Sequence, residues 1–516
     1  MKYITGINRK QLVLFPTSLD AAVEQDNEVR LIDLFVESID IASMGFTVDR
    51  DENGRPAYHP KDLLKLYLYG YLNGIRSSRK LEKATKINIE VKWLMSGLEP
   101  DHNTISNFRR DNPKAIKKVF RASVQIAKHF ELIGGKLIAG DSTKLRAQNS
   151  KKNNFNQKKI DRHLAYIENK LDQYNKQLSD NDGDKNKENI DKIKKEIEKQ
   201  NSRKDNYQKL EKQLKETGET QISTSDPDSR HMITRNNITE VAYNIQTTVD
   251  EKNKIPIDFK VTDTNDGKAM GNMLRRAKTI LKTNDFTALY DKGYHTGSEF
   301  DIADKLGIKV LVAVPKVATN APNIAYNVEN FTYDKDNDFY ICPQGNKLTT
   351  TGKIHKAKTY NFKRYTAKAC LNCPVKAECS KAKYGKAIQH SEYQDLIEAN
   401  KENIENNENY YKQKQAIVEH PYGTIKRQWG FSYIMTKKYK HRAEADVGLI
   451  FTAYNLRRLI NILGFEKLSK YLKEYIYLFV SLLSEIRLNL SRFKQSYFFN
   501  NYFSIYSKQS LKIDYI

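Results

Sequence analysis

The 516-residue sequence has only four cysteines, no long apolar run and far fewer acidic than basic residues. So few cysteines in so long a chain exclude a secreted disulfide scaffold. A transmembrane helix needs roughly 18 consecutive apolar residues, and the longest candidate, residues 475–483, falls well short of that. The N-terminus has neither the apolar core nor the small-residue cleavage site of a signal peptide. We therefore expect a reduced, cytoplasmic protein.

The shortage of acidic side chains leaves a strongly basic chain. Lys and Arg number 87 against 63 Asp and Glu, so the formal net charge is +24. Hydrophobic residues make up 39% of the chain, which is enough for real cores and excludes wholesale disorder. Each Lys or Arg that neutralises a phosphate releases a counterion. The charge therefore favours a nucleic-acid partner over the alternative, a soluble protein with a merely Lys-rich surface.

The segment 1–135 is rich in short helical patterns. A polar cap at residues 101–103 precedes a predicted short helix over residues 104–110. Small polar side chains at the start of such a helix can reach base edges in a major groove, while the arginines behind them hold phosphates. An ordinary helical bundle with an exposed basic helix is the alternative. The candidate DNA-binding residues are Asn103, Thr104, Ser106, Arg109 and Arg110.

Residues 136–317 change to the patterns of an α/β domain. Strands are predicted over 136–141, 241–249, 256–261, 286–290 and 308–314, with helices over 270–281 and 298–306. Three meandering strands followed by strands joined through helical crossovers predict a mixed sheet.

A proline-free segment, residues 151–220, interrupts this domain with 18 basic and 14 acidic residues. Its apolar residues follow the 3-4 spacing of a coiled-coil seam, and the polar run 179–184 breaks the pattern in the middle. The seam residues are Leu164, Ile167, Leu171, Tyr174, Leu178, Ile190, Ile193, Ile197, Tyr207, Leu210 and Leu214. We predict an inserted antiparallel helical hairpin whose charges form a solvated face.

Three acidic residues are candidates for chemistry. Asp141 and Asp291 stand at the predicted ends of two strands, where active sites in such sheets gather. Glu419 follows an apolar helical run and precedes Lys426 and Arg427, two candidate DNA-binding residues for the phosphate backbone. Carboxylates that meet would repel each other unless a divalent cation neutralised them, and Mg²⁺ prefers oxygen ligands. Any one of these acids alone is an ordinary surface group, so the hypothesis depends on their combination with the fold order and the charge.

The four cysteines all lie between the second aspartate and the glutamate. They are Cys342, Cys370, Cys373 and Cys379. A C-x-x-C pair with two further thiols is the composition of a closed structural Zn²⁺ site. His355 and His390 are alternative ligands, and free reduced thiols are the alternative to a metal site.

Around the three acids the sequence resembles the DDE transposases of bacterial insertion sequences, which have a ribonuclease-H-like catalytic core and a helix-turn-helix-type N-terminal domain. The matching motifs are AGDST (139–143), ALYDKGY (288–294) and VEHPYGTIKR (418–427), with further matches at 224–230 and 453–458. They occur in the right order and cover roughly residues 10–464.

The resemblance implies an enzyme that cleaves DNA at the ends of its element and transfers the strand into target DNA. It implies that Asp141, Asp291 and Glu419 form the catalytic triad holding two Mg²⁺ ions, with Lys426 at the family's lysine position. It also implies a homodimer on double-stranded DNA, bound to terminal inverted repeats and target in the nucleoid. The family's Tyr and Arg before the glutamate are replaced by Lys412 and Gln415. We expect Tyr411, Lys412 or Lys414 to compensate for them.

The expected architecture is an α/β protein with a ribonuclease-H-like mixed-sheet core. Its segments are a helical DNA-binding domain (1–135), the core (136–317 and 396–464), the inserted hairpin (151–220), a four-cysteine insertion (318–395) and an aromatic-rich helical tail (465–516).

Two other functions fit parts of the sequence. One is a nuclease or junction resolvase with the same fold, which the N-terminal helices and the cysteine insertion argue against. The other is a transposase-derived DNA-binding protein that has lost catalysis; the intact acids argue against it, whereas Gln415 and the tail argue for it.

Overall fold

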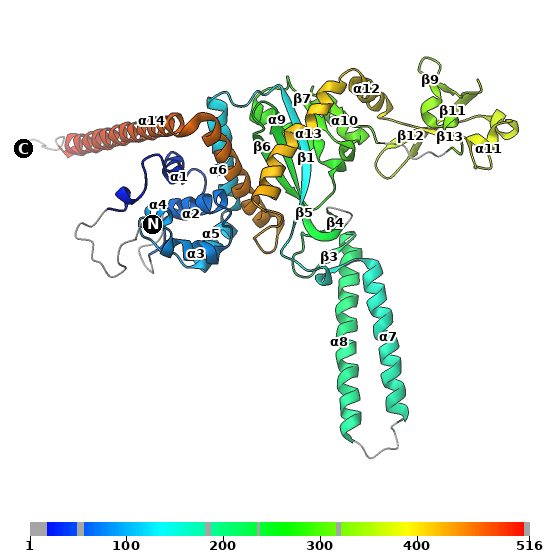
Figure 1. Ribbon diagram of the computed structural model, residues 1–516, viewed down its shortest axis with the longest axis horizontal. Coiled ribbons are helices and arrows are strands. Elements are labelled where there is room, and N and C mark those ends of the chain that lie inside the picture. Colours follow the sequence, from blue (N-terminus) through cyan, green and yellow to red (C-terminus); the bar gives the residue numbers. More distant parts are fainter. Residues whose placement is uncertain (1–17, 49–55, 181–186, 235–237, 316–320, 510–516) are drawn as a thin grey trace, which may run out of the picture. The chain divides into compact units, whose positions relative to one another are not determined.

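The computed structural model describes residues 18–48, 56–180, 187–234, 238–315 and 321–509 (Figure 1). By its contacts the chain divides into two units, residues 1–123 with 445–516, and residues 124–444. This division is coarser than the five predicted segments, whose boundaries stay a prediction. Within the described ranges, no helix is long and apolar enough to cross a membrane.

The first unit is helical, as the pattern of its sequence predicts. Its helices are α1 (Glu28–Glu37), α2 (Pro60–Leu72), α3 (Ser78–Ile87), α4 (Ile89–Leu94), α5 (His102–Asp111), most of α6 (Pro113–His129) and most of α14 (Lys440–Gln509). The short helix predicted over 104–110 is α5. The Asp101 carboxylate caps it by accepting hydrogen bonds from the backbone N–H groups of Asn103 and Thr104, at 2.7 and 2.9 Å. Helix α14 is interrupted at Gly464, where φ is 74°.

A buried charge network ties α14 to the N-terminal helices within this unit. The Asp446 carboxylate is fully buried and lies 2.5 Å from Arg76 Nη2 and 3.5 Å from Arg109 Nη1. The Tyr71 hydroxyl accepts a 2.8 Å hydrogen bond from Arg109 and donates to Asp446. Arg109 is only 3% exposed. The prediction that Arg109 binds DNA phosphate is therefore wrong, because its guanidinium is committed to the interior.

The second unit is built on a six-stranded mixed sheet. Its strands are β1 (Leu137–Arg146), β4 (Arg230–Ile233), β5 (Thr239–Asp250), β6 (Pro256–Thr262), β7 (Thr287–Tyr290) and β8 (Lys309–Val312). The strands run in the order β6-β5-β1-β7-β8, and β4 pairs with the start of β5. Strand β5 is antiparallel to β1 and β6, whereas β7 is parallel to β1 and β8. This confirms the predicted mixed sheet.

One face of the sheet is covered by α13 (Glu408–Gly423), which contacts β1, β5 and β7 (Figure 1). Successive side chains of a strand alternate between the two faces, so every second apolar residue of β1 meets this helix. The shared core consists of Leu137, Ala139, Val249, Leu289, Leu311, Ile417 and Val418. Helices α9 (Met270–Leu281), α10 (Gly297–Lys305) and α12 (Gln394–Glu405) also pack against the strands. Since Asp141 shares the alternation of Leu137 and Ala139, it belongs to the face that α13 covers.

The segment predicted as a hairpin insertion contains α7 (Gln157–Asp180), which packs on α8 (Lys187–Thr217). Ile167 is fully buried and Leu214 is 7% exposed, as seam positions should be. Two-residue strands, β2 (Asn154–Phe155) and β3 (Ile222–Ser223), pair where the insertion begins and ends.

The cysteine-containing segment forms a second, five-stranded antiparallel sheet. Its strands are β9 (Thr332–Asp334), β10 (Phe339–Ile341), β11 (Lys347–Lys356), β12 (Asn361–Thr366) and β13 (Ala387–Ser391), in the order β13-β12-β11-β10-β9. The sequence pattern did not predict this sheet. Its core is small and mostly aromatic: Phe331, Tyr340, Leu348, Tyr365 and Ile388.

Candidate active site

Asp141 lies within β1, opposite Thr247 of β5. We expected the strand to end at this residue, but β1 continues to Arg146 because its ladder with β5 extends that far. The Asp141 carboxylate accepts a 2.7 Å hydrogen bond from the backbone N–H of Ser142. Asp141 therefore has a fixed position in the middle of the sheet.

Asp291 directly follows β7, the parallel neighbour of β1. The register pairs Ala139 with Leu289, and continuing it by two residues sets Asp141 level with Asp291. The Asp291 carboxylate accepts a 2.8 Å hydrogen bond from the backbone N–H of Gly293, capping the 3-10 turn η5 (Lys292–Tyr294). The two predicted strand-end aspartates thus come from adjacent strands.

Gly140, between the core residue Ala139 and Asp141, is required by close packing. A Cβ atom built there would lie 1.9 Å from the ring of Tyr290. The glycine makes room for the buried ring of Tyr290, which directly precedes Asp291. A substitution at Gly140 would therefore push apart the two strands that carry the aspartates.

Helix α13 brings a buried lysine to Asp141. Lys414 is 8% exposed, and its Nζ lies 3.2 Å from Asp141 Oδ2. Two turns further on, the Tyr422 hydroxyl donates to the Asp141 backbone carbonyl at 3.3 Å. Burial raises the pKa of the Asp141 carboxyl, the Lys414 charge opposes this rise, and the Asp291 charge adds to it. Lys414, one of the residues proposed to compensate for the missing arginine, thus contacts a catalytic candidate.

A third aspartate, Asp266, lies beside these two and was missed. It follows β6 and accepts 2.7 Å hydrogen bonds from the side-chain amides of Asn244 and Gln246. A Cβ atom on Gly293 would lie 3.0 Å from Asp291 Oδ1 and 3.4 Å from Asp266 Oδ2. Although burial opposes it, the amide hydrogen bonds and the Lys144 charge lower the pKa of Asp266. Its signal in the sequence is that it follows the third strand of the meander, as Asp291 follows β7.

Glu419 occupies a different part of α13. It is exposed, and its carboxylate accepts a 2.7 Å hydrogen bond from Gln415 Nε2, one turn earlier. Lys426 and Arg427 follow in the π-helical turn η9 (Thr424–Gln428), a distortion that is frequent at functional sites. Lys426 Nζ donates to the Lys144 carbonyl at 3.2 Å. The structure thus brings Asp141 and Asp291 together, whereas Glu419 bonds to a residue of its own helix.

The donor set at the sheet fits a divalent cation only in part. Asp141, Asp291 and Asp266 supply the hard oxygen ligands that Mg²⁺ prefers, and Lys414 and Lys144 offset part of their charge. Across the described part of the chain, however, no three His, Cys, Asp or Glu side chains are arranged as a metal-binding group. Asp141 and Asp291 are the residues that would hold such an ion.

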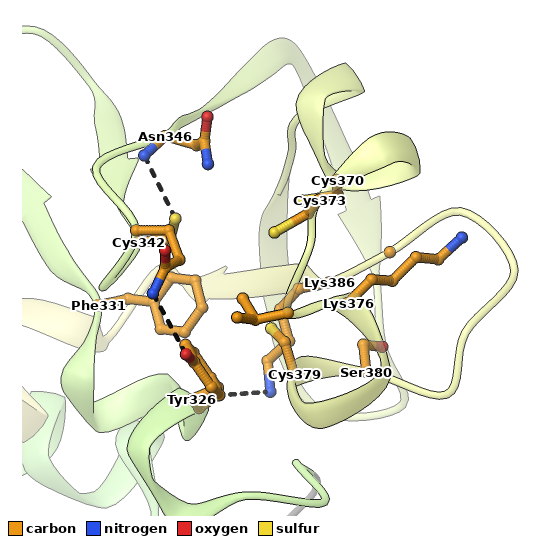
Figure 2. Close-up of a pocket in the computed structure, with 13 residues that line it drawn as sticks. Tyr326, Phe331, Cys342, Asn346, Cys370, Cys373, Lys376, Cys379, Ser380 and Lys386 are labelled. Atoms are coloured by element: carbon orange, nitrogen blue, oxygen red, sulfur yellow. Dashed lines mark hydrogen bonds between the residues drawn. The ribbon is translucent and has the colours of Figure 1, made fainter.

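The four cysteines line one small pocket (Figure 2). Cys342 comes from the turn after β10, and Cys379 ends the short helix α11 (Lys376–Cys379). All four are free thiols, and burial raises the pKa of the Cys379 thiol. Gly385, with φ of 87°, would place a Cβ atom 2.3 Å from the Cβ of Cys370. The four cysteines therefore share one pocket, but no three of the described Cys, His, Asp or Glu side chains are arranged as a metal-binding group. A metal at the cysteines stays a prediction.

Helix α5 exposes only part of its predicted DNA-binding set. Asn103 and Arg110 are exposed, and Thr104 and Ser106 are half-buried. Arg110 makes a forked ion pair with Asp111, with both N–O distances 2.6 Å. Within this helix Asn103 and Arg110 are thus the exposed candidates.

Two family models match the chain. The transposase domain model (DUF772) matches residues 17–111, and the transposase DDE domain model matches residues 341–460. Asp141 and Asp291 lie between these matches, whereas Glu419 and the cysteines lie inside the second. No curated protein matches the chain.

A cryo-EM structure of the piggyBac transposase synaptic complex with hairpin DNA is similar at 10% identity, covering 90% of this chain and 82% of that chain, with a TM-score of 0.32. A TM-score this low does not establish a shared fold. The class therefore follows from the two family matches, which define a transposase. Within that class the chain is a DDE transposase, an enzyme that cleaves DNA.

Proposed function

We propose that this transposase cleaves DNA at the ends of a bacterial insertion sequence and joins the freed ends to target DNA by a two-metal mechanism. The observation that carries the proposal is the pairing of Asp141 and Asp291 on adjacent parallel strands, on the face covered by the helix that carries Glu419. The strand order β6-β5-β1-β7-β8, with three antiparallel strands followed by two parallel ones, supports a ribonuclease-H-like core.

In this proposal Asp141, Asp291 and Glu419 are the metal ligands. Bound divalent cations supply Lewis-acid activation of the attacking oxygen and stabilise charge on the leaving oxygen. Lys414 balances the buried charge of Asp141, and Tyr422 holds the backbone of β1 at that residue. Lys426 and Arg427 stabilise the charge that develops on the phosphate.

The DNA partner is proposed to be the duplex of the terminal inverted repeats, contacted by Asn103, Thr104, Ser106 and Arg110 of α5. Joining two ends in one reaction requires two active sites, so a homodimer on DNA in the nucleoid is the assembly that we propose. The cysteine pocket is proposed to hold a structural Zn²⁺, because four thiols in one pocket match the donor set of a closed tetrahedral site.

The test uses purified full-length protein and a duplex that carries one element end. Asp141→Ala, Asp291→Ala and Glu419→Ala should each abolish Mg²⁺-dependent cleavage, while binding of the end changes little. Glu402→Ala, which removes a carboxylate from α12, is the matched control and should cleave normally. Cleavage that survives Asp141→Ala or Asp291→Ala would refute the assignment of these two ligands.

One observation favours a second candidate, the transposase-derived DNA-binding protein without catalysis. Glu419 is exposed and bonded to Gln415 of its own helix. The two candidates separate when a free 3′ end is supplied with Mg²⁺ or with EDTA. A joined product that requires the metal supports the transposase and excludes both a catalytically lost protein and a simple nuclease or resolvase.

A further inference from the structure

The cysteine insertion carries a large share of the positive charge of the chain. Residues 341–390 contain eleven Lys and Arg and a single acidic residue, Glu378. That excess of ten charges in 50 residues compares with a net +24 over all 516 residues. The helical hairpin is the opposite case, because its 18 basic residues in 151–220 are matched by 14 acidic ones.

In the sheet of the insertion, the apolar core lies on one face and basic side chains lie on the other. Leu348, Tyr365 and Ile388 point to the inner face and are at most 1% exposed. Because strand side chains alternate, their neighbours Lys347, Arg364 and Gln389 point outward. The register supports this assignment, because Arg364 is paired with Gln389, as Tyr365 is with Ile388.

We name the outward side of β11, β12 and β13 the basic sheet face and define it by Lys347, Lys353 and Arg364. All three are exposed, and none has an ion-pair partner among the described residues. Lys347 lies 4.4 Å from the ring centroid of Phe339, which orients its charge along the sheet. The ring of Phe362 stacks on His355 at 5.4 Å.

Several further outward positions are polar and uncharged. They include Thr349, Thr351, Thr366 and Gln389, whose hydroxyl and amide groups can donate to phosphate oxygens. Strands β11, β12 and β13 contain no Asp or Glu; the nearest acids along the chain are Asp338, before β10, Glu378, before β13, and Glu392, after β13. A surface on which cations and polar groups predominate suits a nucleic-acid backbone better than a protein hot spot.

We propose that the basic sheet face binds the phosphate backbone of the DNA on which the transposase acts. The inference rests on the proposed function for the identity of the polyanion, and on charge complementarity for the surface. It assigns the insertion a second role besides its cysteine pocket: the pocket holds the segment together, and the sheet beside it presents three cations to one duplex.

The test is the salt dependence of DNA binding by the full-length chain. The triple variant K347Q/K353Q/R364Q is compared with the parent by fluorescence anisotropy on a duplex of one element end, at several salt concentrations. Each lost phosphate contact lowers the slope of log K against log salt by about 0.9, so the expected decrease is about 3. The matched control K194Q/K195Q/K209Q removes three exposed lysines from α8 and should change the slope by less than about 1.

Additional measurements serve as controls for the folding of the variants and for the role of charge. Equal melting temperatures of the parent and both triple variants establish that the fold is intact, and K347R/K353R/R364K, which retains the charge, should keep the parental slope. An unchanged slope in K347Q/K353Q/R364Q, with cleavage by the parent intact, overturns this inference and leaves the proposed function standing. A reduced slope in K347Q/K353Q/R364Q, combined with a parent that does not cleave DNA, supports the basic sheet face and refutes the proposed activity. A larger loss on duplex RNA or polyglutamate than on DNA overturns the choice of partner.

Discussion

At the scale of single residues, the active-site face is a balance of buried charges. Lys414 is paired with the Asp141 carboxylate, and both side chains are largely withdrawn from water. Removing one partner of such a pair leaves the other uncompensated, at a cost much larger than the net contribution of the pair. Replacing Lys414 should therefore have a larger effect than replacing a lysine on the surface.

We predict that Lys414→Met lowers the rate of DNA cleavage by about 10²-fold or more, the cost typical of losing one group that stabilises charge at an active site. Lys401→Met, which changes an exposed lysine of α12, should leave the rate within a few-fold. Single-turnover cleavage assays with equal DNA occupancy make the comparison. Equal rates for the two variants would contradict a role for Lys414 at Asp141.

A second prediction concerns Asp446. Asp446→Asn leaves the buried guanidinium groups of Arg76 and Arg109 without their carboxylate, so we expect a loss of about 3–5 kcal/mol in the free energy of unfolding. Chemical denaturation followed by fluorescence measures the change. Asp20→Asn, which breaks the ion pair of the exposed Asp20 with Arg30, is the control and should lower the free energy of unfolding far less.

Asp338, in the insertion, provides a pH-dependent prediction. Hydrogen bonds from Lys363, Tyr365 and Tyr333 lower the pKa of this carboxyl in the folded state. Its contribution to stability is therefore present above the unfolded pKa of about 3.9 and is lost as pH falls toward the lower folded value. Asp338→Asn should lower the melting temperature at pH 7, and the difference from the parent should shrink below about pH 4. A difference that grows on acidification would contradict this assignment.

At the scale of elements, the hairpin depends on its seam. Ile167 is fully buried between α7 and α8, whereas the neighbouring Tyr166 is 53% exposed. Ile167→Ala should destabilise the hairpin by about 2–5 kcal/mol, seen as faster amide hydrogen exchange along both helices. Tyr166→Ala should change exchange little, and equal effects would contradict the packing.

The elements predicted from the sequence are those with a strong local period. The alternation in β5 and the coiled-coil spacing of α7 are visible within one window, so the mixed sheet and the hairpin were predictable. Strands β9–β13 were not, because they are short and their core is small. Arg109 was misassigned because its partner, Asp446, lies 337 residues further on, where no local pattern can reveal it.

The residues of the candidate site fall into the same two groups: those with a local sequence pattern and those whose placement depends on distant contacts. Asp141 and Asp291 were predictable as strand-associated acids, and the register then placed them level with each other. The direction in which Glu419 points depends on how α13 rotates against the sheet, which is set by the packing of Ile417 and Val418. Asp266 is held by hydrogen bonds from the side-chain amides of Asn244 and Gln246. The short polar loop that carries it has no periodic pattern in the sequence.

At the scale of the whole molecule, the first unit is completed by the last part of the chain. Buried side chains of α14, among them Val447, Leu449, Phe451 and Leu459, belong to the same unit as the N-terminal helices. Phe120 packs edge-on against Phe451 at 6.3 Å. Without α14, the apolar surface of the N-terminal helices would face water.

We predict that a chain ending at residue 444 loses amide protection in α2 and α5 and binds the element end at least tenfold more weakly. A chain ending at residue 477, which keeps every buried residue described in α14, should retain both properties. Hydrogen exchange and anisotropy titration measure the two variants side by side. Full protection in the shorter chain would contradict the shared core.

This arrangement has a consequence for synthesis on the ribosome. The residues that close the first helical unit are translated more than 300 positions after the helices that they cover. Nascent chains must therefore make the whole second unit before the first can reach its final packing. Products of premature termination would lack a finished N-terminal unit, so an incomplete copy would compete poorly with the intact enzyme for its ends.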